Sequence, residues 1–167
     1  LVSVMAVNNE TGVVNPVEDL GLGAKQCGAL FHVDAVQAAG KVPLAVDAWH
    51  CDLLSLAGHK FHGPAGAAAL FVRRRVKLVP QVHGGHQERG RRAGTENVAA
   101  IAGLGAAAAR ARALLAAGSA HRVAALGALL LAGLLAGVPD TRLNGDLNQR
   151  VGGILNLCFA GVDGEAV

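Results

Sequence analysis

The 167-residue sequence is poor in aromatic side chains and in cysteine. Phe and Trp together supply 3% of it and tyrosine is absent, so a core must be built from small aliphatic side chains. The three cysteines, Cys27, Cys51 and Cys158, lie far apart without CxxC spacing, which excludes a disulfide framework and fits a reducing cytoplasm. We interpret all three as structural. At 52% hydrophobic residues, the chain has enough apolar surface for a sizeable core.

Charge is also scarce: charged residues make up 16% of the sequence and the formal net charge is +3. The basic residues cluster at 73–75 and at Arg89, Arg91 and Arg92. A short basic run can bind nucleic acid. Because no aromatic stacking residues are interleaved with these clusters, we expect a solvated strand end or an anion site and no nucleic-acid partner.

A membrane-length apolar run is missing. The uncharged run 123–138 has 16 residues, short of the roughly 20 that a spanning helix needs, and it contains three glycines. We therefore expect a buried helix and no membrane partner. No signal peptide is visible, and the sequence starts at Leu1 and stops at Val167 without obvious start or stop signals, so we expect both ends to be internal to a longer protein.

The first half alternates short apolar runs with loops or helices, a pattern that favours an α/β layered domain with a largely parallel sheet. Pro16 opens a predicted helix that reaches about Cys27 and is closed by Gly28. Strands are predicted at 1–7, 29–33, 52–56 and 67–72, the last two in a hairpin-like pair.

The second half is Ala-rich and predicted to be helical from Glu96 to about Gly137, with a break near Gly118. Strand pieces are predicted at 143–145 and 154–159. The boundary near Leu115 predicts one domain over 1–115 and the start of another over 116–167.

Four polar residues come directly after a predicted strand: Asn9, Asp34, His59 and Lys60. Ligands of parallel α/β sheets gather at the carboxyl ends of the strands, so this shared position predicts a binding site there.

Lys60 is flanked by Gly58 and Gly63-Pro64, which restrict the backbone around it. Burial near other cations lowers a lysine's pKa, and the neutral amine can then form a Schiff base. The alternative is an ordinary surface lysine in a turn.

Asp34 follows a predicted buried strand, where a carboxylate needs a cationic partner. The protonated pyridine nitrogen of pyridoxal phosphate (PLP) is such a partner, and Gln37 could hydrogen-bond the phenolic oxygen of that ring. The alternative is that Asp34 is an N-cap for the segment that follows.

The segment 83–97 is rich in glycine and arginine and ends in Thr95-Glu96-Asn97 before the long helical region. Backbone donors of Gly94 and Thr95, with the Thr95 hydroxyl, could bind a phosphate. The alternative is a flexible surface loop in which Thr95 caps the helix.

In this order and spacing, the segments 7–12, 32–37, 58–64 and 83–97 resemble the cysteine desulfurases, in particular their nitrogen-fixation (NifS-like) branch within the class V aminotransferase superfamily. Asn144-Gly145-Asp146 and Gly164-Glu165-Ala166 are also similar to that family. The resemblance implies PLP fold type I, an α/β fold, with part of the large mixed or parallel-sheet domain and the start of the small C-terminal α+β domain.

The resemblance also implies site residues. Lys60 would be the catalytic lysine that forms the internal aldimine, Asp34 would pair with the pyridine nitrogen, and Gln37 would contact the phenolic oxygen. Asn9 would lie by the cofactor and the substrate carboxylate, His59 would hold the phosphate, and Thr95 would reach the phosphate of a neighbouring subunit in a homodimer.

The implied reaction takes sulfur from L-cysteine through a quinonoid-type intermediate, leaves a persulfide on a catalytic cysteine and releases alanine. A sulfur-acceptor or scaffold protein for iron–sulfur cluster assembly would be the partner. None of the three cysteines matches the family's catalytic position, and the arginine that grips the substrate carboxylate is not in the chain, so we expect activity only of the full-length parent.

One residue departs from the pattern, because Ala57 stands where many desulfurases have a serine that binds the phosphate. Losing one hydrogen bond to a charged group costs about 1.5–3 kcal/mol, which predicts weakened PLP binding. Some selenocysteine lyases also lack this serine, so a selenocysteine lyase or another class V lyase or transaminase is the alternative enzyme.

Two further alternatives remain from the sequence. The pairs His59/His62 and His83/His86 have a spacing used by zinc sites, although we expect no metal. An inactive fragment is the other alternative.

Overall fold

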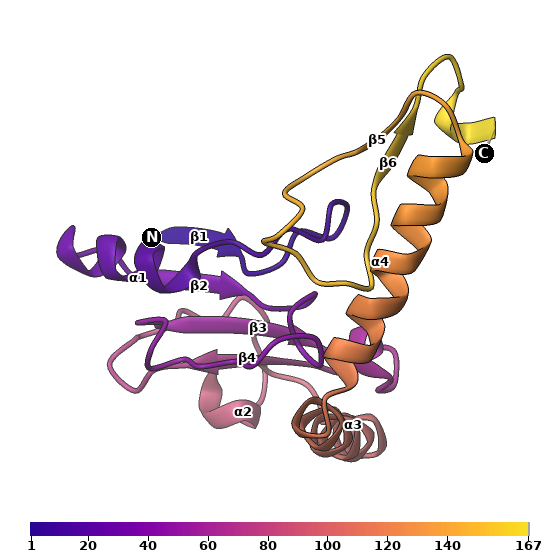
Figure 1. The fold of residues 1–167 in the computed structure, drawn as a ribbon. Coiled ribbons are helices and arrows are strands. Elements are labelled where there is room, and N and C mark those ends of the chain that lie inside the picture. The colour runs from indigo at the N-terminus through magenta and orange to yellow at the C-terminus, as the bar shows by residue number, and fades with distance from the viewer. Residues whose placement is uncertain (167) are drawn as a thin grey trace.

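The computed structural model describes residues 1–166 and contains a sheet-based part and a helical arm (Figure 1). The sheet-based part holds the first half of the chain. The arm is the long helix α4, Ser119–Gly137, which rises from one end of the sheet beside a small second sheet (Figure 1). Of the domain predicted over 116–167, Val167 lies outside the described residues.

The main sheet has four strands in the order β1-β2-β3-β4. The first two pairings are parallel and the β3–β4 pairing is antiparallel, which confirms both the parallel sheet and the hairpin-like pair predicted from the sequence. The strands are β1 (Val2–Met5), β2 (Phe31–Asp34), β3 (Leu53–Ala57) and β4 (Ala68–Val72).

The other elements connect these strands or follow them. The predicted break near Gly118 is confirmed, because Gly118 has a left-handed backbone (φ 78°) that glycine adopts without strain. The elements are α1 (Val17–Gln26), the 3₁₀ turn η1 (Gly58–Phe61), the short turn α2 (Gln87–Gly90), α3 (Val98–Ala116), β5 (Thr141–Leu143), β6 (Leu157–Phe159) and η2 (Gly164–Ala166).

The core lies on one face of the main sheet, under α1. Successive strand residues point to opposite faces, so Phe31 and Val33 face α1 and are both 0% exposed, while His32 and Asp34 face the other way. The helix packs so closely that a Cβ at Gly21 would collide with the Trp49 carbonyl oxygen. This burial holds β2 rigidly in the middle of the sheet.

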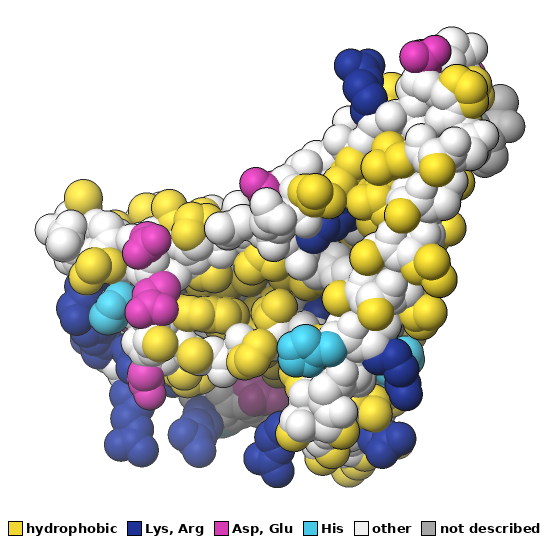
Figure 2. All heavy atoms as spheres, viewed as in Figure 1, with side chains coloured by type: hydrophobic (Ala, Val, Ile, Leu, Met, Phe, Trp, Pro, Cys, Tyr) yellow, Lys and Arg dark blue, Asp and Glu magenta, His cyan; other side chains and the backbone are white. Residues whose placement is uncertain are grey.

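Two predictions need correction. The strand predicted at 1–7 is shorter, Val2–Met5, and has β2 as its one neighbouring strand within residues 1–166. Its first residues are exposed, whereas Ala6 and Val7 directly after it are buried in the core. The helix predicted to be buried, α4, buries Leu131 alone, because it contacts α3 and β5 and leaves most of its surface free. Figure 2 shows hydrophobic side chains along this free surface.

By length and composition alone, α3 and α4 are each apolar enough to cross a membrane. Such helices also occur in the cores of soluble proteins, so this property does not separate the two environments. The expectation that the protein has no membrane partner stays a prediction.

The turn after β1 is closed by a segment from the far end of the chain, residues 149–156. The Val14 amide donates to the Gln149 carbonyl and the Val151 amide donates to the Gly12 carbonyl, both at 2.9 Å. The Arg150 guanidinium also reaches the Thr11 carbonyl, at 3.2 Å. Residues 7–14 are therefore held in place by a clamp that is remote in sequence.

Candidate functional site

The polar residues predicted to form a site follow strands that are neighbours in the sheet. Asn9 lies in the turn after β1, Asp34 ends β2, and His59 and Lys60 lie on η1 directly after β3. Because β1, β2 and β3 are parallel and adjacent, their carboxyl ends meet at one edge. The fold therefore brings these four residues to the same edge of the sheet.

The turn that carries Asn9 is ordered by its neighbour, Asn8. The Asn8 Oδ1 accepts hydrogen bonds from the Glu10 amide (2.9 Å), the Thr11 amide (2.8 Å) and the Thr11 hydroxyl (3.1 Å). Such side-chain-to-backbone bonds stabilise a tight turn. Asn9 itself is exposed, and its Nδ2 donates to Glu10 Oε1 at 2.7 Å.

Asp34 is not a helix N-cap, because no helix lies between β2 and β3 within residues 1–166, but its side chain makes the corresponding contact with a turn. The Val36 amide donates to Asp34 Oδ1 at 2.9 Å, so the carboxylate stabilises the turn that follows β2. The second oxygen accepts no hydrogen bond within residues 1–166 and remains available to a cationic partner. Capping and cofactor binding are therefore compatible, because a carboxylate has two oxygens.

The lysine sits on a backbone that has little freedom. The Gly58 amide donates to the Ala67 carbonyl and the Gly63 amide donates to the Gly58 carbonyl, both at 2.8 Å. A Cβ at Gly58 would lie 3.1 Å from the Ala67 oxygen, so a larger residue would push the two strand ends apart. Phe61 anchors the turn in the core, while His59 and Lys60 are exposed. A fixed turn thus presents a free lysine side chain.

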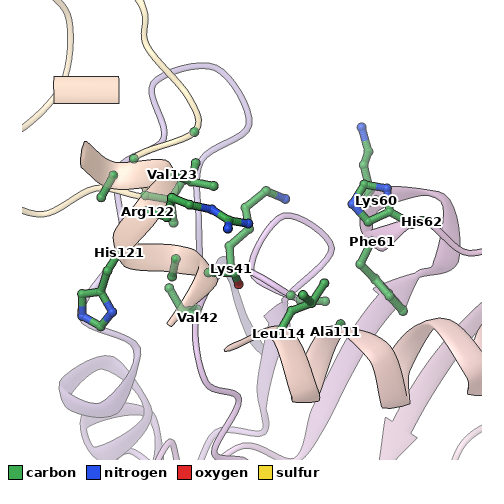
Figure 3. Close-up of a pocket in the computed structure, with 18 of the residues that line it drawn as sticks. Lys41, Val42, Lys60, Phe61, His62, Ala111, Leu114, His121, Arg122 and Val123 are labelled. Carbon is green, nitrogen blue, oxygen red and sulfur yellow. The ribbon is translucent and has the colours of Figure 1, made fainter. Parts of the chain in front are cut away.

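Sequence reasoning missed a second lysine beside this one. Lys41 and Lys60 both line a cavity of about 520 Å³, and Figure 3 shows their side chains extending from separate loops. Burial, and next the positive charge of Lys60, lower the pKa of Lys41. Lys41 Nζ donates to Gln37 Oε1 at 3.3 Å. The signal in the sequence was the spacing of four residues between Gln37 and Lys41, which places neighbours on one turn of chain.

The cavity lies between η1, the loop after β2, the junction of α3 and α4, and the loop at 150–153. Asp34, Gln37, Asn9 and His59 are not among its walls. Its walls contain basic side chains and no carboxylate: Lys41, Lys60, His62, His121, Arg122 and Arg150. The cavity is therefore electropositive and opens beside the lysine.

Thr95 does not cap a helix, so the N-cap part of the loop interpretation of the segment 83–97 is wrong. The N-cap of α3 is Asn97, whose Oδ1 accepts from the Ala100 amide at 3.2 Å. Asparagine is among the best N-cap residues, and the helix starts two residues later than a Thr95 cap would require. Thr95 is exposed in the loop between α2 and α3. Within residues 1–166, no hydrogen bond joins it to the residues at the sheet edge.

The side chains at the sheet edge fit PLP in chemical type. Lys60 offers a primary amine. Within residues 1–166, one Asp34 carboxylate oxygen and the Gln37 amide nitrogen make no hydrogen bond, while the other oxygen of Asp34 and the Gln37 oxygen are engaged. The ring nitrogen and phenolic oxygen of PLP need an acid and a donor of these kinds. Their roles toward the cofactor stay predictions.

The buried cysteine, Cys51, is placed as a structural residue and not as a reactive thiol. Cys51 is 0% exposed and its thiol contacts the Leu53 carbonyl at 2.7 Å, and burial raises its pKa. A thiol with a raised pKa is a poor nucleophile at neutral pH. Residues 1–166 also contain no group of three or more His, Cys, Asp or Glu side chains placed to hold a metal, so the metal-binding alternative gains no support.

Comparisons with known proteins agree over the full length of the chain. The family model described as aminotransferase class-V matches residues 1–167. Cysteine desulfurase 2 of Trichormus variabilis is 51% identical over 167 residues, and cysteine desulfurase IscS of an Anaeromyxobacter species is 52% identical over 169 residues. Each match covers 100% of this chain and 42% of the relative.

Solved structures give the same result for the fold. A NifS-like protein superposes with a TM-score of 0.92 at 36% identity, covering 98% of this chain and 45% of that protein. DndA from Streptomyces lividans superposes with a TM-score of 0.86 at 42% identity, covering 98% of this chain and 47% of that protein. The α/β fold type I expected from the sequence is therefore confirmed.

Proposed function

This chain belongs to the class-V aminotransferase family, and we propose that its whole protein is a PLP-dependent cysteine desulfurase. The chain spans 42% of the length of the curated relatives it matches, so the activity is proposed for the whole protein. Relatives about half identical across the entire chain bear the name cysteine desulfurase. The observation that carries the proposal is the position of Lys60 on a rigid turn beside the end of the strand that carries Asp34.

We propose the following roles at the sheet edge. The Lys60 amine binds the cofactor covalently, the free Asp34 oxygen keeps the ring nitrogen protonated, and the Gln37 amide donates to the phenolic oxygen. The turn ordered by Asn8 presents Asn9 toward the cofactor and the substrate carboxylate. PLP, when bound, supplies an electron sink for the substrate's Cα electrons.

The phosphate is proposed to bind His59 and the Thr95 hydroxyl of a second subunit. Both side chains are exposed, which leaves them accessible to an anion. Within residues 1–166, no hydrogen bond joins Thr95 to the residues at the sheet edge, and this is consistent with a homodimer in which Thr95 reaches the neighbouring site.

In the proposed reaction, the carbon–sulfur bond of L-cysteine breaks, alanine leaves, and the sulfur forms a persulfide on a cysteine thiol of the protein. Cys51 is a poor acceptor because it is buried with a raised pKa. Since none of the three cysteines matches the catalytic position that the resemblance implies, we propose that the acceptor thiol belongs to another part of the whole protein. The persulfide sulfur would pass to an acceptor or scaffold protein for iron–sulfur cluster assembly. A cytoplasmic location, proposed from the three free cysteines, can be checked by cell fractionation.

The decisive experiment is a covalent trap at Lys60. The whole protein is incubated with PLP, reduced with borohydride and digested, and the modified peptide is identified by mass spectrometry. We expect a visible absorbance band that disappears on reduction, and a stable adduct on Lys60. Cysteine should then yield alanine with the unreduced enzyme.

Lys41→Ala is the matched control, because Lys41 lines the same cavity. We expect this variant to keep the adduct on Lys60, whereas Lys60→Ala should lose both the adduct and the activity. An adduct that persists in Lys60→Ala would overturn the proposal. Assays with selenocysteine beside cysteine distinguish a selenocysteine lyase, the alternative favoured by Ala57.

A further inference from the structure

A histidine in the central part of the sheet is held by serines from both neighbouring strands. His32 lies on β2, and its Nδ1 is 2.7 Å from the Ser3 hydroxyl on β1. Its Nε2 is 2.8 Å from the Ser55 hydroxyl on β3. We call this set of three residues the serine–histidine bracket. Within residues 1–166, no other side-chain hydrogen bonds join β1, β2 and β3.

The bracket lies on the face of the sheet that carries Asp34. Ser3 stands opposite His32 in the register of β1 and β2, and Ser55 stands opposite Asp34 in the register of β2 and β3. Side chains in register across parallel strands point to the same face. Asp34 is therefore two residues beyond His32 on the same face, while Phe31 and Val33 occupy the core face.

The chemistry of the bracket does not depend on the protonation of the ring. A neutral imidazole has one donor and one acceptor nitrogen, a protonated one has two donors, and a serine hydroxyl both donates and accepts. Both contacts can therefore be satisfied in either tautomer and in the imidazolium form. The chain contains only three serines, and two of them make these contacts.

A nucleophilic role for these serines is disfavoured by the same geometry. In a nucleophilic serine–histidine site, one ring nitrogen contacts the serine and the other contacts a carboxylate that orients the ring. Here both ring nitrogens are engaged by serines, and Asp34 Oδ1 accepts from the Val36 amide. The arrangement links strands and lacks the charge needed to activate a hydroxyl.

The three strands joined by the bracket lead to the three parts of the site. β1 leads into the turn of Asn9, β2 ends at Asp34, and β3 leads into the turn of Lys60. A small shift of β2 along its neighbours would move Asp34 relative to Lys60, and misplacement by about 1 Å can cost on the order of 100-fold in rate. The two hydrogen bonds of His32 oppose that shift, and His32 lies only two residues before Asp34.

We propose that His32 is a positioning residue that, through Ser3 and Ser55, fixes the placement of Asp34 relative to Lys60. This inference rests on the proposed function, because it concerns the binding of PLP at that site. His32 acts through the strands and does not itself touch the cofactor or substrate.

The first test reads the bracket in the cofactor-free whole protein. Nitrogen-15 NMR of the His32 ring is recorded in wild type and in Ser3→Ala, Ser55→Ala and Ser119→Ala. We expect Ser3→Ala to shift the Nδ1 resonance and Ser55→Ala to shift the Nε2 resonance. Ser119→Ala, the remaining serine, should leave both unchanged. If Ser3→Ala and Ser55→Ala leave the ring resonances where they are, the bracket is absent and the proposal is wrong.

The second test measures PLP affinity and the absorbance of bound PLP, both of which depend on the position of Asp34. His32→Leu removes both hydrogen bonds at similar volume, and His32→Gln keeps one donor and one acceptor on a flexible chain. We expect His32→Leu to bind PLP about tenfold more weakly, which corresponds to about 1.4 kcal/mol, and to shift the pH midpoint of the bound cofactor's absorbance. His32→Gln should recover most of the affinity and of the midpoint.

A merely structural role gives a different result. If His32→Leu lowers the melting temperature but leaves the PLP affinity and the absorbance midpoint as in wild type, the positioning role is overturned. If wild-type protein forms no adduct at Lys60, the proposed function fails and the positioning role fails with it. The ring resonances still report the bracket in that case, so the two failures are distinguishable.

Discussion

The sheet-based part and the helical arm differ sharply in how much of their apolar surface they bury. In the sheet-based part, Phe31 and Val33 are 0% exposed under α1. In the arm, Leu126 is 62% exposed and Leu129 is 71% exposed, although α4 is as apolar as a core helix. Within residues 1–166, apolar side chains are thus buried in the sheet-based part and exposed on the arm.

The proposed site obtains its rigidity from the sheet-based part and not from the arm. All the residues proposed to hold PLP on their own chain follow strands that pack on the buried core. The arm contributes Ser119 to Ala124 to one wall of the cavity beside Lys60 and lends little packing to the sheet. A site built on the buried part is held in place by about 1.5–3 kcal/mol for each fully buried large apolar side chain.

The largest expected effect is the difference in unfolding free energy between a substitution in the sheet-based part and one in the arm. Phe31→Ala should lower the free energy of unfolding by about 3–5 kcal/mol, because it leaves a cavity in a fully buried position. Leu129→Ala should change it by about 0.5 kcal/mol or less, because that side chain is already in solvent. Urea unfolding of the whole protein measures both. A large loss in Leu129→Ala would mean that the whole protein covers the arm.

A smaller effect is expected at a buried carboxylate in the sheet-based part. Asp52 is 3% exposed, accepts from the Phe31 amide at 3.1 Å and pairs with Arg75 at 2.7 Å. Asp52→Asn should cost about 1.5–3 kcal/mol, because a hydrogen bond to a charged group is lost in a buried place. The control is Asp47→Asn, since Asp47 is 86% exposed in its pair with Arg73 and should contribute at most about 1 kcal/mol. If the two variants lost the same free energy of unfolding, burial would not explain the cost of Asp52→Asn.

The smallest effect is expected at an exposed carboxylate beyond the arm. Hydrogen bonds from the Gln149 and Asn148 amides lower the pKa of Asp146 below 3.8. A carboxyl with a lowered pKa in the folded state contributes stability that is present above 3.8 and is lost as the pH falls through the lowered value. Asp146→Asn should therefore be slightly less stable than wild type at neutral pH and equal to it at low pH. Urea unfolding midpoints of both proteins at neutral and at low pH test this prediction. A stability difference between variant and wild type that grew in acid would contradict it.

Much of the main sheet could be predicted from the sequence because its signals are local. Apolar runs ending in Asp34 and in Gly58-His59-Lys60 mark β2 and β3, and the left-handed break at Gly118 was visible as glycine between two helical stretches. The parallel arrangement follows from alternation of strands and helices. These signals are read from neighbouring residues, although the pairings that they predict join residues farther apart.

The rest depended on partners that are distant in sequence. The exposure of α4 is decided by what packs against it, and hydropathy alone predicts burial. The cap of α3 fell on Asn97 and not Thr95, since both residue types cap helices and the choice depends on where the helix meets η1. The proximity of Lys41 to Lys60 and the serine–histidine bracket each join residues 19 or more positions apart, which no local pattern reveals. The spacing of Gln37 and Lys41 indicates only their own hydrogen bond.

The clamp between the turn after β1 and residues 149–156 has a consequence for biosynthesis. A ribosome adds about 5–20 residues per second, so a contact spanning 139 positions, such as Arg150 with Thr11, becomes possible on the order of ten seconds after the first partner is made. The hairpin of β3 and β4 that frames Lys60 needs only a short stretch of nascent chain. The lysine turn can therefore be finished early. The Asn9 turn is ordered locally by Asn8 but gains its clamp only when the later segment emerges, so the lysine side of the site is complete before the Asn9 side.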